Sequence, residues 1–215
     1  MEAALIGFAV LLVLVFLRMP IAFAMGVVGF AGFGFLSGFD PSLAMVGTLV
    51  SDTALNYGLS VVPMFILMGN FVARAGLSSE LYDASHAFLG HKRGGLSMAT
   101  IVACGGFSAI CGSSLATAAT MSKVALPPMR KYGYADTLAT ASIAAGGTLG
   151  ILIPPSVILV IYGLMTETSI RELFAAGFLP GLLGIILYLV AVKYVVWRDP
   201  SAGPAAPKRN WADRL

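Results

Sequence analysis

The sequence predicts an all-α integral membrane protein with about five membrane-crossing helices, one re-entrant helical hairpin and one broken helix. Of the 215 residues, 58% are hydrophobic and only 11% are charged, and the mean hydropathy is +0.91. Soluble domains carry about 25% charged residues, so this composition excludes a soluble domain. Two segments rich in Gly, Ser, Thr and Pro, 105–128 and 144–156, interrupt apolar surroundings. Non-helical backbone in lipid must line a cavity or be covered by protein, so these segments predict a polar site.

The crossings are read from the long apolar runs. A span needs about 20 residues, and the first two runs lie near the short limit. The fourth run contains the second polar segment, so it is expected to be an interrupted crossing. The five expected crossings are 3–17, 21–36, about 59–72, about 137–165 and about 174–197.

Two further segments have the pattern of helices that lie along the membrane surface. Segment 41–57 is moderately apolar but contains Asp52 and Asn56. Segment 77–92 places apolar residues at helical spacing opposite a polar face that includes Glu80, Asp83 and His86. This amphipathic pattern is typical of an interfacial helix.

The positions of Lys and Arg test this topology. With the N-terminus outside, almost all basic residues near the crossings fall on the cytoplasmic side, as the positive-inside rule requires. Arg171 is the exception; the others are Arg18, Arg74, Lys92, Arg93, Arg130, Lys131, Arg198, Lys208 and Arg209. The pattern holds only if segment 94–128 enters from the cytoplasm and returns to it. An ordinary pair of crossings would also do this, but 35 residues are short for two spans and a turn. We therefore expect a re-entrant helical hairpin.

The tip of this hairpin is expected at 110–114. Gly112 can adopt backbone angles closed to other residues, and Ser113 or Ser114 can cap the returning helix. Ser113, Thr117 and Thr120 would share one helix face, which is polar but carries no acid. Such a face suits Na⁺ held by carbonyl and hydroxyl oxygens, whereas a Ca²⁺ site would supply carboxylates. Close packing of small residues between membrane helices explains the same pattern and stays open as an alternative.

The second segment is expected to break a helix. The Gly146–Gly147 pair weakens it, and Pro154 and Pro155 deprive the carbonyls of Gly150 and Ile151 of their usual donors. Freed carbonyls are the ligands that a buried Na⁺ needs. A simple proline kink, satisfied by neighbouring hydroxyls, is the alternative. We favour the ion site because glycines and prolines cluster here, whereas a single proline would suffice for a kink.

Other functional classes lack support. No Walker A pattern occurs, and Ser108 lacks the second Gly of a nucleophile elbow and a His at membrane depth. Cys104 and Cys111 lack zinc-site spacing, so no transition metal is expected. The sequence contains no basic stripe interleaved with aromatic residues, which is the pattern that would indicate nucleic-acid binding. We therefore expect neither an enzyme nor a nucleic-acid-binding protein.

At these residues the chain resembles the large membrane subunit of the tripartite ATP-independent periplasmic (TRAP) transporters. The matching text is GGFSAICGSSLATAATMSKVALPPM, KYGYADTLATASIAAGGTLGILIPPS, FLRMPIAFAMG and VPMFILMGNFVARAGL, and the resemblance covers residues 1–199. It implies half of an inverted-repeat, elevator-type transporter in the bacterial inner membrane, driven by Na⁺. It also implies a small TRAP membrane subunit and a periplasmic solute-binding protein that delivers an organic acid, of dicarboxylate or sialic-acid type.

The resemblance also suggests site residues, with the hairpin tip at 108–117 and the broken helix at 146–155. Na⁺ coordination is assigned to backbone and hydroxyl oxygens of Gly112, Ser113, Ser114, Gly146, Thr148 and Gly150. Residues expected to line the substrate site are Ser108, Thr117, Pro154 and Pro155.

The expected organisation follows these segments in order. It comprises scaffold-type helices at 1–75, an interfacial helix at 76–93 and a transport-domain half at 94–166. An extracytoplasmic segment with the fifth crossing follows at 167–198, and a cytoplasmic linker at 199–215, whose 203–209 stretch reads as flexible and basic. Since the family has a second, inverted copy, we expect the chain to be a fragment or a split half. A one-component elevator-type carboxylate carrier and a non-transporting membrane scaffold remain alternatives.

Overall fold

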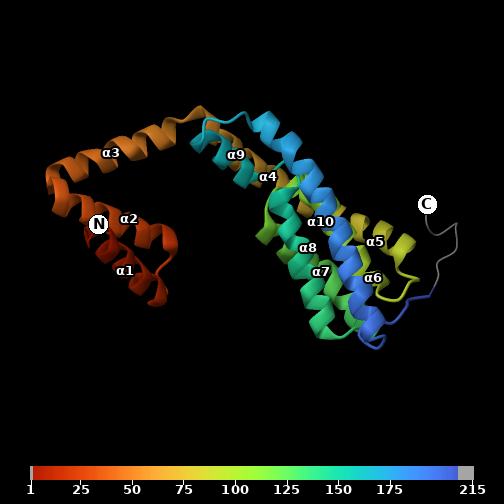
Figure 1. Cartoon of the computed structure of the whole chain (residues 1–215). Helices are drawn as coiled ribbons and strands as arrows, with labels where there is room; N and C mark the ends of the chain where they lie inside the picture. The colour runs from red at the N-terminus through yellow and green to blue at the C-terminus, as the bar shows by residue number, and fades with distance from the viewer. Residues whose placement is uncertain (1, 208–215) are drawn as a thin grey trace. The chain divides into compact units, whose positions relative to one another are not determined.

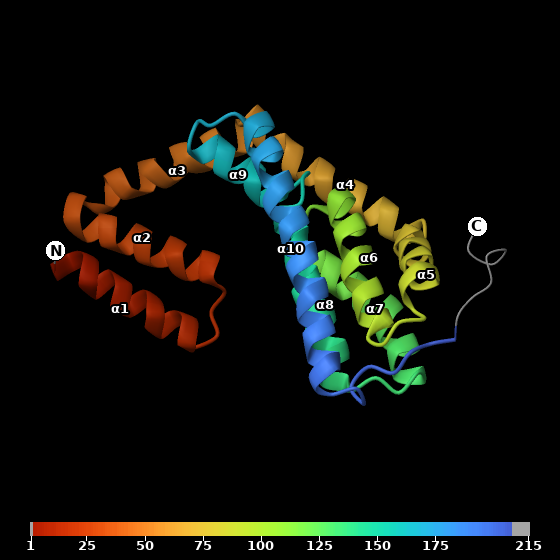
Figure 2. The ribbon, with the colours of Figure 1, turned by 45° about the vertical axis from the view of Figure 1, so that its right-hand side comes forward.

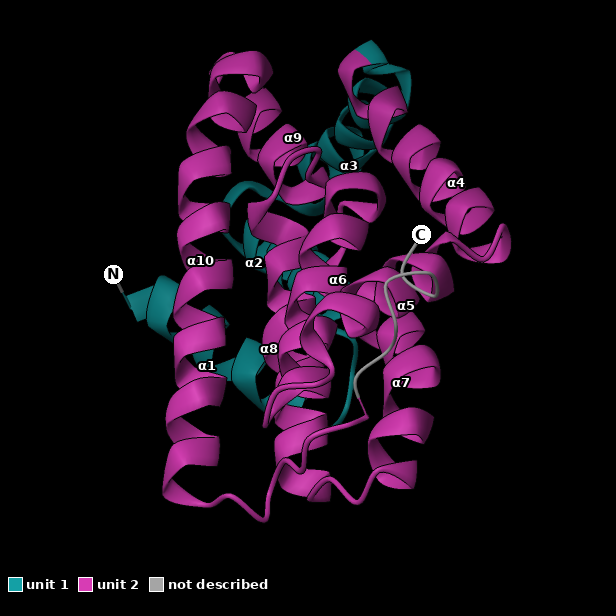
Figure 3. Ribbon diagram, turned by 90° about the vertical axis from the view of Figure 1, so that its right-hand side faces the viewer, with its two compact units in different colours: residues 1–57 teal, residues 58–215 magenta. Residues whose placement is uncertain are grey.

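The computed structural model describes residues 2–207, and within this range the chain is helical and contains no strand (Figures 1 and 2). The described residues form two compact units, which divide at Tyr57 (Figure 3). The division falls earlier than the expected boundary at residue 75, so the third expected crossing groups with the second unit. Each unit is described separately.

The first unit consists of three helices, α1 (Glu2–Phe16), α2 (Ile21–Ser37) and α3 (Phe39–Leu55). α1 packs on α2, and α2 packs on α3. Gly38, with φ of +100°, separates α2 from α3, and the Ser42 hydroxyl donates to the Phe30 carbonyl at 2.9 Å. Most apolar side chains of the unit are exposed. Outward apolar side chains are expected where lipid or another protein covers the helices.

The second unit begins with a short 3₁₀-helix (Tyr57–Ser60) followed by α4 (Val61–Arg74) and α5 (Leu77–Leu89). The amphipathic segment therefore forms a helix close to its expected bounds. α5 packs along α6 and buries Tyr82 and Ala87, while the apolar Phe88 is 53% exposed. Helical periodicity identified the helix but not which neighbour its buried face contacts.

The centre of the second unit is a helical hairpin, α6 (Gly95–Cys111) and α7 (Ser114–Lys131), packed against α8 (Asp136–Leu152) (Figure 1). Its core lies among these three helices. The largest fully buried side chains there are Phe107, Leu96, Ile101, Met121, Met129 and Leu149. At 1.5 Å per residue, helices of 17 and 18 residues fall short of the usual 20-residue span. The hairpin is thus present, and its re-entrant course stays a prediction.

Beyond α8 the chain forms α9 (Val157–Met165) and α10 (Ile170–Arg198). Among the described residues, three helical stretches are long and apolar enough to cross a membrane: Tyr57–Arg74, Asp136–Met165 and Ile170–Arg198. They correspond to the third, fourth and fifth expected crossings. α1 and α2 are apolar but shorter.

The expected position of the break in the fourth crossing needs a correction. We expected it at 146–155, but α8 continues through the Gly146–Gly147 pair to Leu152. A Cβ at Gly146 would lie 2.8 Å from the Cys104 sulfur, and one at Gly147 would lie 2.8 Å from the Ala118 Cβ. These glycines therefore permit close helix contact. The non-helical part is 153–156, where the two prolines remove backbone donors.

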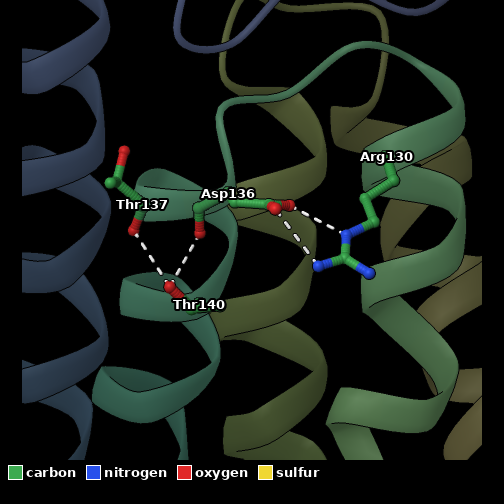
Figure 4. Close-up of polar contacts among 4 residues, drawn as sticks. All are labelled: Arg130, Asp136, Thr137 and Thr140. Carbon is green, nitrogen blue, oxygen red and sulfur yellow. Dashed lines mark hydrogen bonds and ion pairs between the residues drawn. The ribbon is translucent and has the colours of Figure 1, made fainter.

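The turn between α7 and α8 is held by exposed polar contacts (Figure 4). Arg130 makes two hydrogen bonds to Asp136, at 2.8 and 3.1 Å, which hold the pKa of that carboxyl below its ordinary value. Within α8, the Thr140 hydroxyl donates to the Asp136 carbonyl at 2.7 Å. Nearby, the buried Tyr134 hydroxyl accepts a hydrogen bond from the Leu96 N–H at 3.1 Å, which satisfies one donor at the start of α6.

The segment after α10 is packed rather than free, which differs from the expected flexible linker. Its carbonyls accept from Gly94 and Ala135, and the Ala206 N–H donates to the Gly90 carbonyl. Ala202 and Ala206 are buried. We call residues 199–206 the strap, because they tie the end of α10 to the α5–α6 and α7–α8 turns. Small side chains allow this close approach. Residues 208–215 of the expected linker lie outside the described residues.

Candidate functional site

The tip of the hairpin is a two-residue turn between α6 and α7. Gly112 has φ of +63°, and its N–H donates to the Ser108 carbonyl at 3.1 Å, which ends α6. Ser113 is extended, and its side chain accepts from the Ala116 N–H at 3.4 Å, so it caps α7. A left-handed glycine followed by a capping serine thus reverses the chain within two residues. The sequence-based position of the tip is confirmed.

The break between α8 and α9 repeats this chemistry with different residues. α8 ends at Leu152, and Pro154 and Pro155 follow. Ser156 is fully buried, and its hydroxyl accepts from the Leu159 N–H at 3.4 Å, so it caps α9. Since proline has no N–H, the carbonyls of Gly150 and Ile151 lack their usual helical donors.

The hairpin tip and the break lie against each other. The Val157 N–H donates to the Gly112 carbonyl at 3.2 Å. A Cβ at Gly112 would lie 2.6 Å from the Pro155 carbonyl oxygen. A Cβ at Gly150 would lie 2.7 Å from the Ser113 carbonyl oxygen. Backbone therefore meets backbone here, and side chains at either glycine would separate the two segments.

Four helix ends converge as a result. α6 and α8 end here, and their final carbonyls carry partial negative charge. α7 and α9 begin here, and their first N–H groups carry partial positive charge. This arrangement offers neutral oxygens for a cation and amide donors for an anion within one small region.

The structure brings most of the expected ion-site residues together. Gly112, Ser113, Ser114 and Gly150 meet at the contact between tip and break, and Pro155 lies there too. Thr148 does not join them: its hydroxyl lies 2.9 Å from the Tyr188 hydroxyl of α10 and donates to the Ala145 carbonyl.

Gly146 also lies apart from the tip and packs on Cys104 and Ile101 of α6. Pro154 faces α10 instead of the tip, since a Cβ at Gly177 would lie 3.4 Å from its ring. These two positions are therefore helix contacts in the structure.

The hydroxyls expected to line the substrate site are buried. Ser108 and Thr117 are both fully buried, on α6 and α7. The Ser108 hydroxyl has no hydrogen-bond partner among the described residues. Buried polar groups nearly always have a partner, so this hydroxyl is suited to an ion, a water molecule or a polar solute. The Thr117 hydroxyl likewise has no hydrogen-bond partner among the described residues.

Sequence reasoning missed the part of the site that α4 contributes. A cavity of about 220 Å³ lies between α4 and the tip, lined among others by Gly69, Asn70, Cys111, Ser113, Thr120 and Val157. A Cβ at Gly69 would lie 3.2 Å from the Cys111 sulfur, so this glycine lets α4 approach the tip. The Gly69–Asn70 pair inside an apolar run was the available signal.

The chemistry of this region depends on neutral groups. In the part of the chain that the structure describes, no Asp, Glu, Lys or Arg lines the cavity beside the tip. Within residues 2–207, no group of three or more His, Cys, Asp and Glu side chains could hold a metal ion. Any cation held here would be coordinated by carbonyl and hydroxyl oxygens.

Comparison with known proteins identifies the family of this chain. The chain matches the family described as "Tripartite ATP-independent periplasmic transporter, DctM component" over residues 8–212. It is 40% identical over 177 residues to the C4-dicarboxylate TRAP transporter large permease protein DctM of Pseudomonas aeruginosa, covering 80% of this chain and 41% of that protein. It is 36% identical over 211 residues to the ectoine/5-hydroxyectoine TRAP transporter large permease protein UehC of Ruegeria pomeroyi, covering 96% of this chain and 48% of that protein.

A third relative is the 2,3-diketo-L-gulonate TRAP transporter large permease protein YiaN of Escherichia coli, 34% identical over 84% of this chain and 42% of that protein. The chain thus spans less than half the length of these three relatives. The family match, however, covers nearly the whole chain. The chain therefore belongs to the DctM component family of the TRAP transporters, and it is a membrane protein.

Proposed function

We propose that this chain forms the N-terminal half of the large permease subunit of a Na⁺-coupled secondary transporter that imports organic acids. The observation that carries the proposal is the contact between the hairpin tip and the α8–α9 break. Broken helices that meet inside a membrane protein are the usual construction of ion and substrate sites in secondary transporters.

The ion would be held by backbone at the ends of α6 and α8. The carbonyls of Gly150 and Ile151 lack helical donors, and the Ser113 carbonyl lies beside Gly150. The residues present fit Na⁺, since this set of neutral oxygens contains no carboxylate that Ca²⁺ would favour. We therefore retain Gly112, Ser113, Ser114 and Gly150 as the residues that form the ion site. When bound, Na⁺ would couple its own gradient to the transport of the substrate.

The substrate carboxylate would be held by the opposite helix ends. α7 and α9 both direct their N-termini to this region, where amide donors and the helix dipoles favour an anionic group. Ser108 and Thr117 add buried hydroxyls. The relatives are named for C4-dicarboxylates, ectoine and 2,3-diketo-L-gulonate, so their names cover several small polar solutes. A dicarboxylate or a sialic acid is the substrate type that we propose.

The proposal includes the other parts of a TRAP system. A small TRAP membrane subunit and a periplasmic solute-binding protein would be partners; one relative is named as a permease protein DctMQ. The distribution of Lys and Arg supports the proposal of a bacterial inner-membrane protein with its N-terminus in the periplasm and residue 199 onward in the cytoplasm. The strap, which links both turns to α10, supports movement of the second unit as one body in an elevator mechanism.

Uptake of a labelled organic acid into proteoliposomes tests this function. The vesicles would contain the complete large subunit, the small subunit and the binding protein, with and without an inward Na⁺ gradient. We expect uptake to require the gradient, and Ser113→Ala to weaken the Na⁺ dependence. Ser122→Ala is the matched control, because its hydroxyl donates to the Ala119 carbonyl away from the tip. Uptake that is equal with and without Na⁺ would contradict the proposal.

The other readings of the sequence predict different results. A one-component carboxylate carrier would transport without a binding protein, and the family match favours the tripartite system over it. A non-transporting scaffold would show no uptake, and Na⁺ would change neither its stability nor the labelling of Cys111 beside the tip.

A further inference from the structure

A second cavity lies far from the hairpin tip, at the other end of the helices of the second unit. It has a volume of about 400 Å³ and is lined by the α5–α6 turn, the first turn of α6 and the last turns of α10. The residues that line it are Lys92, Arg93, Met98, Lys193, Val196, Trp197 and Pro200. Nothing in the site described above uses these residues.

Among residues 2–207, three basic side chains line this cavity and no carboxylate does. Among the described residues, Arg130 and Asp136 form a salt bridge, and it lies outside this cavity. The acid closest along the chain, Asp199, accepts instead from the backbone N–H and hydroxyl of Ser201. The cavity therefore presents a concentrated positive charge to an external anion.

The position of the cavity along α10 places it at the level of lipid headgroups. α10 has 29 residues and is long and apolar enough to cross a membrane. Lys193 and Trp197 are one turn apart near its end, and the Trp197 ring lies 6.2 Å from that of Tyr194. Aromatic and basic side chains at the end of an apolar span mark the membrane–water interface. The phosphate layer is the nearest dense source of negative charge.

The walls of the cavity fit the remaining parts of a phospholipid. Met98, which is half-buried, and Trp197, which is 78% exposed, form apolar walls beside the basic groups, and Val196 lies behind them with 4% exposure. α6 begins at Gly95, so its positive dipole end adds to the field on the same side. A free phosphate ion would use the charges but not the apolar walls.

We propose that this cavity binds the headgroup of an anionic phospholipid, with Lys92, Arg93 and Lys193 around the phosphate and an acyl chain along Met98 and Trp197. The inference does not depend on Na⁺ coupling or on the transported substrate, because it uses none of the residues at the hairpin tip. Its occupant is a single phospholipid molecule at the membrane interface.

Lipid titration of the purified chain in a neutral detergent tests the proposal. Trp197 reports occupancy by its fluorescence in a Trp211→Phe background, because the chain has two tryptophans. The three titrants are short-chain phosphatidylglycerol, short-chain phosphatidylcholine and inorganic phosphate. We expect a saturable change with phosphatidylglycerol and none with the other two at the same concentrations.

The double variant K92Q/K193Q should bind phosphatidylglycerol about twenty-five-fold more weakly, from about a fivefold contribution of each basic side chain near an anionic group. The double variant R74Q/R171Q removes two exposed charges from elsewhere and should bind like the parent. The single variant K193R, with Lys92 unchanged, keeps the positive charge. It should retain most of the parental affinity for phosphatidylglycerol. Thermal unfolding without lipid shows whether each variant is folded.

Three outcomes would overturn the proposal. Binding of inorganic phosphate as tight as that of phosphatidylglycerol would mean a site for a free anion. Equal losses in the two double variants would mean unspecific attraction to positive charge. Equal binding of phosphatidylcholine would mean that the apolar walls, and not the charges, select the lipid.

Discussion

Gly150→Ala is the most informative single change, because it acts on the contact that carries the proposed function. A Cβ at this position would lie 2.7 Å from the Ser113 carbonyl oxygen, 2.8 Å from its carbonyl carbon and 2.9 Å from the Ser114 nitrogen. Ordinary contacts begin near 3.4 Å, so the tip must retreat by about 0.7 Å. All three atoms belong to backbone and cannot move as a flexible side chain does.

The size of the effect follows from two opposing terms. Overpacking of this kind costs about 1–3 kcal/mol. Replacing a glycine inside a helix with alanine returns about 0.5–1 kcal/mol, because the unfolded chain loses less entropy on folding. We therefore expect a net destabilisation of about 1–2 kcal/mol. For a chain of this size that corresponds to a decrease of several degrees in Tm, at about 2–4 °C per kcal/mol.

Gly106→Ala is the matched control. It lies in α6 of the same unit, and its Cβ would meet only the end of the Leu81 side chain at 3.5 Å, which is an ordinary contact. This variant gains the stabilisation that alanine gives a helix over glycine, without the cost of overpacking. Its Tm should therefore be unchanged or slightly higher. The two alanine variants should therefore shift in opposite directions or differ by several degrees.

The assay is thermal unfolding of purified protein in detergent, with and without Na⁺ against a K⁺ background. We expect Na⁺ to raise the Tm of the parent and of G106A, and to have little effect on G150A because the tip is displaced. If G150A keeps both the parental Tm and the parental Na⁺ response, the contact between tip and break is not the ion site.

Three further predictions concern contacts away from that glycine. Tyr134→Phe should cost about 1–3 kcal/mol and lower the Tm in unfolding scans, because the Leu96 N–H loses its buried acceptor; the exposed Tyr162→Phe should have no effect. Thr148→Val should leave the Na⁺ response of the Tm intact, because the hydroxyl faces Tyr188; a lost response would return Thr148 to the ion site. Arg130→Gln should have its full effect above about pH 4 and a progressively smaller one below it: the folded pKa of Asp136 is lowered, so the stabilisation is fully present above its ordinary pKa and disappears as pH falls through the lower value. A Tm difference between parent and R130Q that stays constant from pH 6 to pH 3 would refute this assignment.

Local chemistry along the chain predicted the positions of helices and turns. Gly112 followed by Ser113 identified the hairpin tip, because one residue needed a left-handed conformation and the next could cap a helix. Pro154 and Pro155 identified a break, because they remove donors whatever surrounds them. These inferences needed no partner in space. The expected bounds of α5 and of the last three spans therefore fall within a few residues of the observed ones.

The same reasoning placed the break too early, because it took the Gly146–Gly147 pair as a sign of weak helix. A glycine inside a helix can also mark close contact with a neighbour, and the sequence does not distinguish the two. Only the packing of Cys104 and Ala118 against these positions shows that they are contacts. The linker was misread for a similar reason: Gly, Ala and Pro are typical of flexible segments, yet here their small size lets the strap pack on two turns.

The sequence by itself determined that this is a helical membrane protein with two interrupted segments and no acid at its polar site, because composition, proline chemistry and charge distribution act locally. The tertiary structure decided which interrupted residues meet. It brought Gly150 to Ser113 and Gly112 to Pro155, turned Thr148 toward α10, and added Gly69 and Asn70 from α4. It also gathered Lys92, Arg93 and Lys193 into one cavity. Such contacts join residues far apart in the chain, and they depend on how whole helices pack, which no local pattern encodes.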